Sequence, residues 1–153
     1  MLQDLRENLR RTLPAQLQSK VEVIGHTWGE DMTKLQTAGP FDLLLAADLV
    51  WVRSSHPLLI ASLLRLLEDS PNAIIHLACG FHSGKAVVRD FFASAEEAGL
   101  VPAKTYEGEC DWFEMSVTGE KNVWCKYGHC GELELSQEAR NKLTLVAALK
   151  RGW

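Results

Sequence analysis

Two apolar runs of strand length limit what this chain can fold into more than any other feature. Residues 42–51 read DLLLAADLVW and residues 73–80 read AIIHLACG. Nearly continuous apolar runs of this length are typical of parallel strands that are buried on both faces. The segments after them, 57–67 and 84–98, repeat apolar residues at helical spacing. Because these crossovers are long enough for parallel pairing, the sequence predicts an open α/β layer structure.

The remaining segments add a helix at the start of the chain and further strands. The first helix carries leucines along one face and ends at a proline: Leu2, Leu5, Leu9, Leu13 and then Pro14. Alternating apolar residues predict a strand over residues 20–28, and further strands are expected at 101–107 and 143–150. The polar connection 108–141 contains no clear crossover helix, so the last strand is expected to be antiparallel. The length of the chain predicts a single domain over residues 1–153.

Composition and charge narrow the classes of function. The 153 residues are 46% hydrophobic and 24% charged, with a formal net charge of -4. A chain with this charge and no block of lysine or arginine is not typical of a general binder of nucleic acid or acidic membranes. The apolar runs are too short to span a bilayer, and the first residues lack the apolar core of a signal peptide. We therefore expect a cytoplasmic protein, with the nucleus as an additional location.

The cysteines do not predict a metal site. The chain has four of them at irregular spacing, which favours reduced thiols. Cys125, His129 and Cys130 lie close together in CKYGHC. That stretch has neither a CxxC pair nor a second pair at the distance a zinc site requires, so we expect no bound metal.

The carboxyl ends of the predicted strands are where a ligand would bind, because open parallel sheets bind ligands in the crevice at that edge. Trp28 follows one strand and offers a face for stacking; the alternative is an aromatic side chain at the edge of the core. Asp48 follows the small residues Ala46 and Ala47. Its carboxylate is suited to orient an amine or accept its proton; the alternative is a cap of a loop or helix. His82 follows the second apolar run and either faces the substrate or is a solvated loop histidine.

The order of these segments resembles the class I, seven-β-strand S-adenosylmethionine-dependent methyltransferases. The resemblance is carried by VEVIGHTWG, FDLLLAADLVWVRSSHPLLIASL, AIIHLACGFHSG and FFASAEEAGL, and covers residues 1–106 and the last strand. Within that class the chain is most similar to the lysine methyltransferase-like group. In that group it resembles the nicotinamide N-methyltransferase-like fungal enzymes that modify the N-terminus and a lysine of a translation elongation factor. The resemblance implies S-adenosylmethionine as cofactor and a protein amine as substrate, with an elongation factor as one candidate.

The resemblance also implies roles for four residues. Trp28 matches the aromatic residue that lies against the adenine of the cofactor, and Ala47 matches the small residue whose backbone lines the cofactor pocket. Asp48 matches the first position of an Asp-x-x-Tyr motif beside the acceptor amine. Trp51 occupies the tyrosine position, as a non-tyrosine aromatic does in the fungal N-terminus-modifying enzymes, in which a histidine like His56 follows. Its ring would hold the cation-like transition state.

One part of the family pattern is missing. These enzymes open with a strand, a glycine-rich turn, a helix and a second strand that ends in an acid, whereas the eleven glycines here form no G-x-G. The resemblance therefore implies a Rossmann-like sheet without its first strands and glycine-rich loop, the C-terminal part of a methyltransferase fold. We expect weak or no S-adenosylmethionine binding and no activity by this chain alone, which leaves open whether it is an enzyme.

Two other interpretations of the chain remain. One is a non-catalytic methyltransferase-like module that binds a protein partner through an exposed sheet edge. The other is an unrelated α/β protein, such as part of an oxidoreductase, which would need its own glycine fingerprint.

Overall fold

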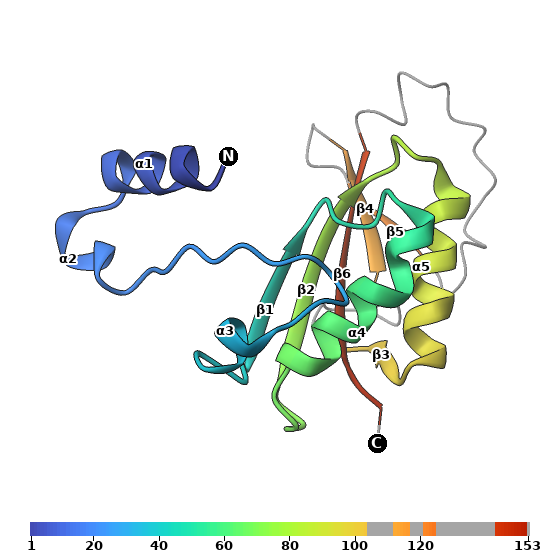
Figure 1. The fold of residues 1–153 in the computed structure, drawn as a ribbon. Coiled ribbons are helices and arrows are strands. Elements are labelled where there is room, and N and C mark those ends of the chain that lie inside the picture. Colours follow the sequence, from blue (N-terminus) through green and yellow to red (C-terminus); the bar gives the residue numbers. More distant parts are fainter. Residues whose placement is uncertain (104–111, 117–120, 125–142, 153) are drawn as a thin grey trace.

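The computed structural model describes residues 1–103, 112–116, 121–124 and 143–152 (Figure 1). The helices, in chain order, are α1 (Leu2–Thr12), α2 (Ala15–Gln18), α3 (Thr33–Gln36), the short 3-10 helix η1 (Arg53–Ser55), α4 (His56–Leu66) and α5 (Lys85–Glu97). The strands are β1 (Leu43–Ala47), β2 (Ile74–Gly80), β3 (Leu100–Pro102), β4 (Trp112–Ser116), β5 (Lys121–Trp124) and β6 (Leu143–Arg151). None of the described helices has the length and apolar character needed to cross a membrane.

One mixed sheet organises these strands in the order β1-β2-β6-β4-β5, and β3 also pairs with β6. β1 and β2 are parallel, with Leu43 opposite Ile74 and Ala47 opposite Ala78. β6 is antiparallel to β2, which confirms the direction expected for the last strand. β4 and β5 form an antiparallel pair inside the segment 108–141, where the sequence predicted only a connection. The α/β class is confirmed.

The core lies between the sheet and the two long helices α4 and α5, which cover the same face (Figure 1). Side chains of β2 alternate, so that Ile75, Leu77 and Cys79 are buried on that face. α4 and α5 contribute the matching apolar side chains: Leu59, Ile60, Leu63, Val88, Phe91, Phe92 and Ala95. We call β1, β2, β6, α4 and α5 together the covered sheet.

The sequence predicted that β1 is buried on both faces, but its second face is exposed. Leu43 and Leu45 are exposed, Leu45 to 77% of its surface. Within the described part of the chain, β1 is an edge strand that pairs only with β2. The apolar run is therefore half covered, because α4 and α5 lie on one side of the sheet only.

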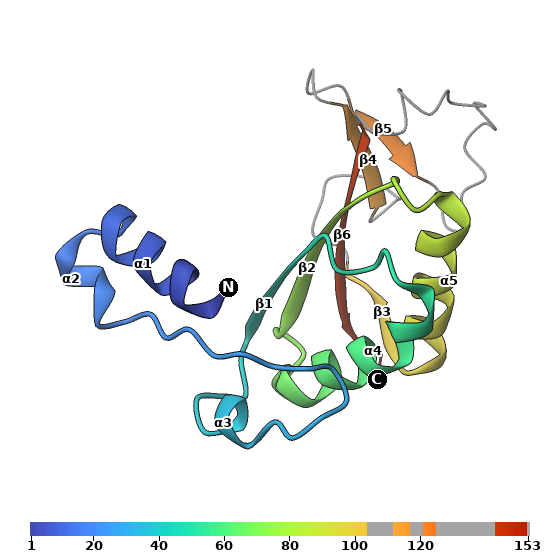
Figure 2. The same ribbon diagram turned by 45° about the horizontal axis from the view of Figure 1, so that its top comes forward.

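Residues 1–25 form a separate arm that lies beyond β1, away from α4 and α5; Figure 2 shows this from a second direction. This N-terminal arm contains no buried residue, although α1 forms where the leucine spacing predicted it. The strand predicted over residues 20–28 is wrong, since residues 21–27 adopt no regular structure. An extended segment becomes a strand only when a neighbour accepts and donates its backbone hydrogen bonds, and no described strand lies beside this one.

Candidate functional site

Asp48 stands directly after β1, at the carboxyl end of the parallel pair. Its φ of 52° lies in the left-handed region, which aspartate tolerates better than most residues. The Asp48 amide donates to the carbonyl of Ala78 at 2.7 Å, and Oδ1 of Asp48 accepts from the amide of Gly80 at 3.4 Å. The two strand ends therefore fix the backbone and the carboxylate of Asp48 together, at the edge where open sheets bind ligands.

His82 is brought to the same edge by β2. Its Nε2 lies 3.8 Å from Oδ1 of Asp48, and the side chains of His82 and Asp48 are 46% and 61% exposed. The ring stands close to Gly80, where an added Cβ would lie 2.9 Å from Nδ1 of His82. The sequence left two alternatives for His82, a residue that faces the substrate or a solvated loop histidine. Its position beside Asp48 depends on the register in which β1 pairs with β2.

Trp51 lies in the loop between β1 and η1, and 55% of its surface is exposed. Its neighbour Val50 is buried, and the Val50 carbonyl accepts a hydrogen bond from Nε2 of the buried His56 at 2.9 Å. The His56 ring packs edge-on against Phe91 of α5 at 5.4 Å between centroids. Through these two contacts His56 anchors the loop that carries Trp51 to the core. The sequence did not predict either contact.

A surface ion pair holds the same loop from outside. Nη2 of Arg53 in η1 lies 2.6 Å from Oδ2 of Asp90 in α5. Both side chains are about half exposed, so the pair contributes little to stability. Together with the His56 contact it joins the loop to α5, so that Trp51 projects from an anchored segment.

Trp28 and Ala47, the residues predicted to contact a cofactor, lie in different surroundings. Trp28 is partly buried and packs against the core. On either side of it, the Gly29 amide donates to Oγ of Ser62 at 3.4 Å, and Nε2 of His26 lies 3.2 Å from the same oxygen. Ala47 is exposed at the end of β1. The position of Trp28 agrees with an aromatic at the core edge, and its adenine-stacking role stays a prediction, as does the role of Ala47.

Cys79 lies beneath this site, on the buried face of β2. Burial raises the pKa of its thiol to about 12, and the negative charge of Asp48 adds to the effect. A thiol held protonated at neutral pH is a poor nucleophile and a poor metal ligand. Among the described residues, no group of three or more His, Cys, Asp or Glu side chains is placed to hold a metal ion. The CKYGHC stretch lies outside those residues.

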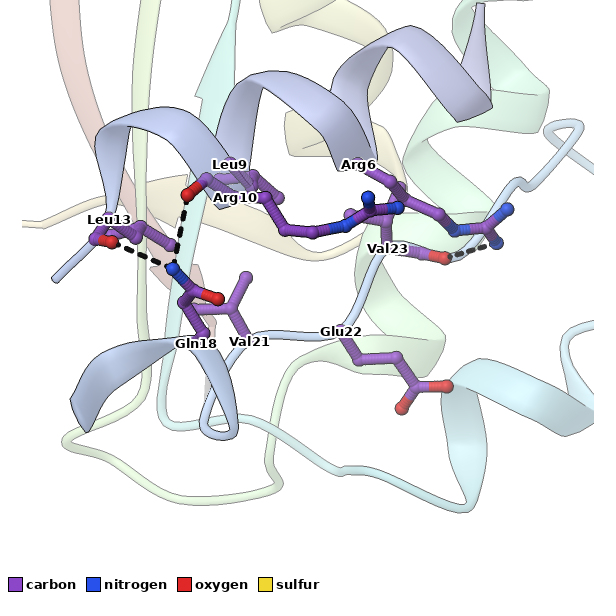
Figure 3. A pocket seen from close by; sticks show the side chains of 8 residues that line it. All are labelled: Arg6, Leu9, Arg10, Leu13, Gln18, Val21, Glu22 and Val23. Atoms are coloured by element: carbon purple, nitrogen blue, oxygen red, sulfur yellow. Dashed lines mark hydrogen bonds between the residues drawn. The ribbon is translucent and has the colours of Figure 1, made fainter. Parts of the chain in front are cut away.

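A groove of about 390 Å³ lies inside the N-terminal arm, between α1 and residues 21–23 (Figure 3). The side-chain amide of Gln18 donates from Nε2 to the carbonyls of Arg10 and Leu13 at 3.1 and 3.0 Å. Nη2 of Arg6 donates to the Val23 carbonyl at 3.1 Å. These bonds fold the arm back on itself. The groove contains none of the residues at the end of β1, and nothing about its lining points to the chemistry of that site.

Comparison with known sequences identifies the family. The profile of a family described as lysine methyltransferase matches residues 1–98, more than half of the chain. The chain belongs to the lysine methyltransferase family. Membership confirms the resemblance to class I methyltransferases, and the α/β sheet is consistent with part of their Rossmann-like fold.

Individual relatives of this lysine methyltransferase family member agree with the assignment. The fission yeast protein N-terminal and lysine N-methyltransferase efm7 (Schizosaccharomyces pombe) is 29% identical in an alignment of 115 residues that covers 70% of this chain and 44% of efm7. The protein N-lysine methyltransferase METTL21A is 35% identical in mouse and 33% identical in zebrafish over 78 residues. That match covers 51% of this chain and 34% of METTL21A. The chain therefore spans less than half the length of these relatives.

Proposed function

We propose that this chain carries the amine-acceptor side of an S-adenosylmethionine-dependent protein N-methyltransferase. The observation that supports the proposal best is the position of Asp48. Its carboxylate stands at the carboxyl end of β1 in a left-handed turn and is held by the Gly80 amide. A carboxylate fixed at that edge is suited to bind an ammonium group from a ligand above the sheet.

The chain contains residues suited to hold part of the methyl donor. The chemistry that S-adenosylmethionine supplies, when bound, is a methyl group activated on a sulfonium. Ala47, small and exposed on an edge strand, leaves backbone open to a ligand, and Trp28 offers an indole at the edge of the core. These two residues would hold the donor. The chain contains no G-x-G turn, so its own affinity for the donor is proposed to be weak.

The roles proposed for the acceptor residues follow from charge and exposure. Asp48 would hydrogen-bond the substrate amine and orient its lone pair, which is most of what methyl transfer asks of a protein. Trp51, exposed on an anchored loop, would place its ring against the developing cation.

The substrate is proposed to be a protein amine, either a lysine side chain or an N-terminal amine. The printed names of efm7 and METTL21A support this class, since they describe methylation of protein lysines and, for efm7, of N-termini. A translation elongation factor in the cytoplasm is the specific partner that the fungal resemblance favours. The nucleus is proposed as an additional location.

A non-catalytic role is the second candidate, and one observation favours it. β1 is an edge strand among the described residues, and it exposes Leu43 and Leu45. Such an edge is suited to pair with an extended segment of a protein partner. A module of this kind would not depend on Asp48.

A label-transfer assay separates the two candidates. The chain is incubated with radiolabelled S-adenosylmethionine at millimolar concentration and a peptide that carries a free N-terminus and one lysine. A fusion of the chain to the preceding segment of efm7 is assayed in parallel. We expect no transfer by the chain alone and transfer by the fusion, and calorimetry of the chain should show no saturable donor binding at submillimolar concentration.

Matched variants complete the assay. Asp48→Asn should abolish transfer, whereas Asp42→Asn, which changes an exposed carboxylate at the opposite end of the same strand, should leave it unchanged. The absence of transfer from both the chain and the fusion would contradict the enzyme proposal and favour the binding module.

A further inference from the structure

We propose that His82 is a catalytic residue of this site, and that Oδ1 of Asp48 and Nε2 of His82 together seat a primary ammonium group. In this arrangement Asp48 holds the ammonium and His82 removes its proton. The inference rests on the proposed methyltransferase function and adds to it the group that produces the reactive, neutral amine.

The distance between the two acceptor atoms supports a shared ligand. At 3.8 Å, Nε2 of His82 and Oδ1 of Asp48 are too far apart for a direct hydrogen bond. A single ammonium nitrogen can donate to both atoms, at about 2.8 Å from each, which is the usual length of a charge-assisted bond. Both side chains are partly exposed, so an amine from solvent can reach the gap.

The backbone around the pair holds this spacing. The Gly80 amide donates to the same Oδ1 that faces His82, which fixes the carboxylate relative to β2. The absence of a side chain at Gly80 leaves room for the His82 ring, since a Cβ there would lie 2.9 Å from Nδ1. The site therefore uses the end of β1 for one acceptor and the turn after β2 for the other.

The two groups differ in the chemistry they offer. A carboxylate accepts hydrogen bonds and binds cations, whereas the unprotonated nitrogen of an imidazole can take a proton and later release it. Nε2 of neutral His82 would take one N–H proton from the ammonium, and the electron pair of that bond would stay on nitrogen as the attacking lone pair. The imidazolium would then return its proton to water. A positioned base of this kind contributes at least about 10²-fold to rate.

Among the described residues, the charged groups at the end of β1, at the start of α5 and across η1 and α5 each have a contact that an ammonium ligand would have to share or leave in place. Asp48 faces it from the end of β1. Lys85, at the start of α5, places its ammonium 5.7 Å from the centroid of the Phe81 ring. Arg53 and Asp90 pair with each other across η1 and α5.

Kinetics of the His82→Gln variant test the proposal. The amide oxygen of glutamine can still accept a hydrogen bond from the ammonium but cannot take its proton. For the fusion in the label-transfer assay, we expect His82→Gln to lower kcat about 10²-fold with a small change in KM for the peptide. The acid-side inflection in the pH profile of kcat should disappear. Asp42→Asn should show the wild-type profile.

Nuclear magnetic resonance of the chain without donor gives a second readout. The ring signals of His82 should move in Asp48→Asn and in Gly80→Ala, and stay in place in Asp42→Asn. His82 signals that do not respond to Asp48→Asn would overturn the pairing. Transfer by His82→Gln at the wild-type rate would overturn the role of His82 and leave the proposed function intact. No transfer by any wild-type form would overturn the proposed function, and the role of His82 with it.

Discussion

The N-terminal arm and the covered sheet start from similar sequence patterns and end in different states. α1 and α5 both carry apolar residues along one face, yet α1 buries none of its residues while α5 buries Val88, Phe91, Phe92 and Ala95. The difference lies in what each helix packs against. α5 lies against the sheet and α4, whereas α1 contacts mainly α2 and the extended residues of its own arm. Amphipathic spacing gives a helix an apolar face, and only a neighbouring element turns that face into core.

The same contrast holds for the extended segments. Residues 42–51 and 20–28 both predicted strands, and only the first contains one. β1 forms because β2 offers a parallel partner across five residue pairs, from Leu43–Ile74 to Ala47–Ala78. The covered sheet should therefore contribute most of the stability of the chain.

The largest expected effect comes from removing a core ring. Phe91 is fully buried and contacts the rings of His56 and Phe92 at 5.4 Å. Phe91→Ala should lower the free energy of unfolding by about 3–5 kcal/mol, measured by urea denaturation, because it leaves a cavity. Leu5→Ala in α1, where 49% of the leucine is exposed, should cost less than about 1 kcal/mol. Equal losses in the two variants would mean that the arm contributes as much stability as the covered sheet.

The next effect concerns the link between α4 and the last strand. The Arg151 guanidinium donates from Nη2 to the carbonyls of Leu64 and Leu67, at the C-terminal end of α4. Arg151→Met should destabilise the covered sheet by about 2 kcal/mol, because it removes charge-assisted bonds and a favourable charge at a helix C-terminus. Arg65→Met, on the exposed side of α4, serves as the control. Thermal unfolding that does not distinguish the two variants would contradict the prediction.

A smaller effect is expected where the arm meets the covered sheet. Gly29 has φ +83°, and an added Cβ would lie 2.6 Å from Cδ2 of Leu58 in α4. Gly84 has φ +91° and ψ 152° with open space around it, so Gly84→Ala reports backbone strain without a steric clash, about 1–3 kcal/mol. Gly29→Ala should show that strain and, in addition, faster proteolysis within residues 1–25. Proteolysis at the wild-type rate would mean that Gly29 does not anchor the arm.

The smallest expected effect is the pH dependence that Cys79 adds to the free energy of unfolding. Its pKa is raised from 9.0 to about 12, so above pH 9 the unfolded chain releases the thiol proton while the folded chain keeps it. The stabilisation that the buried, protonated thiol contributes is complete below pH 9 and falls by about 1.4 kcal/mol per pH unit as pH rises toward the folded pKa. The difference in unfolding free energy between the wild type and Cys79→Ala should therefore shrink from pH 8 to pH 10. A difference in unfolding free energy that does not change with pH would mean that the Cys79 thiol is not buried in the folded chain.

The sequence predicted which residues stand at the end of the first parallel strand, because they are neighbours in the chain; their roles stay predictions. Ala47 ends a recognisable strand and Asp48 and Trp51 follow it, and the end of a parallel strand is where open sheets bind ligands. The contacts of His56 and His82 could not be predicted. His82 meets Asp48 only because β1 and β2 are paired in a register that aligns Ala47 with Ala78.

The α/β class, the positions of α1, α4, α5 and the two parallel strands, and the family resemblance can be predicted from the sequence alone. Local spacing decides these, since apolar periodicity and turn residues act over a few positions. Only the tertiary structure decided which apolar faces are buried, why residues 21–27 form no strand, and which side chains meet at the end of β1. Burial and strand pairing join residues far apart in the chain, as the bond between Gly80 and Asp48 does across 32 positions.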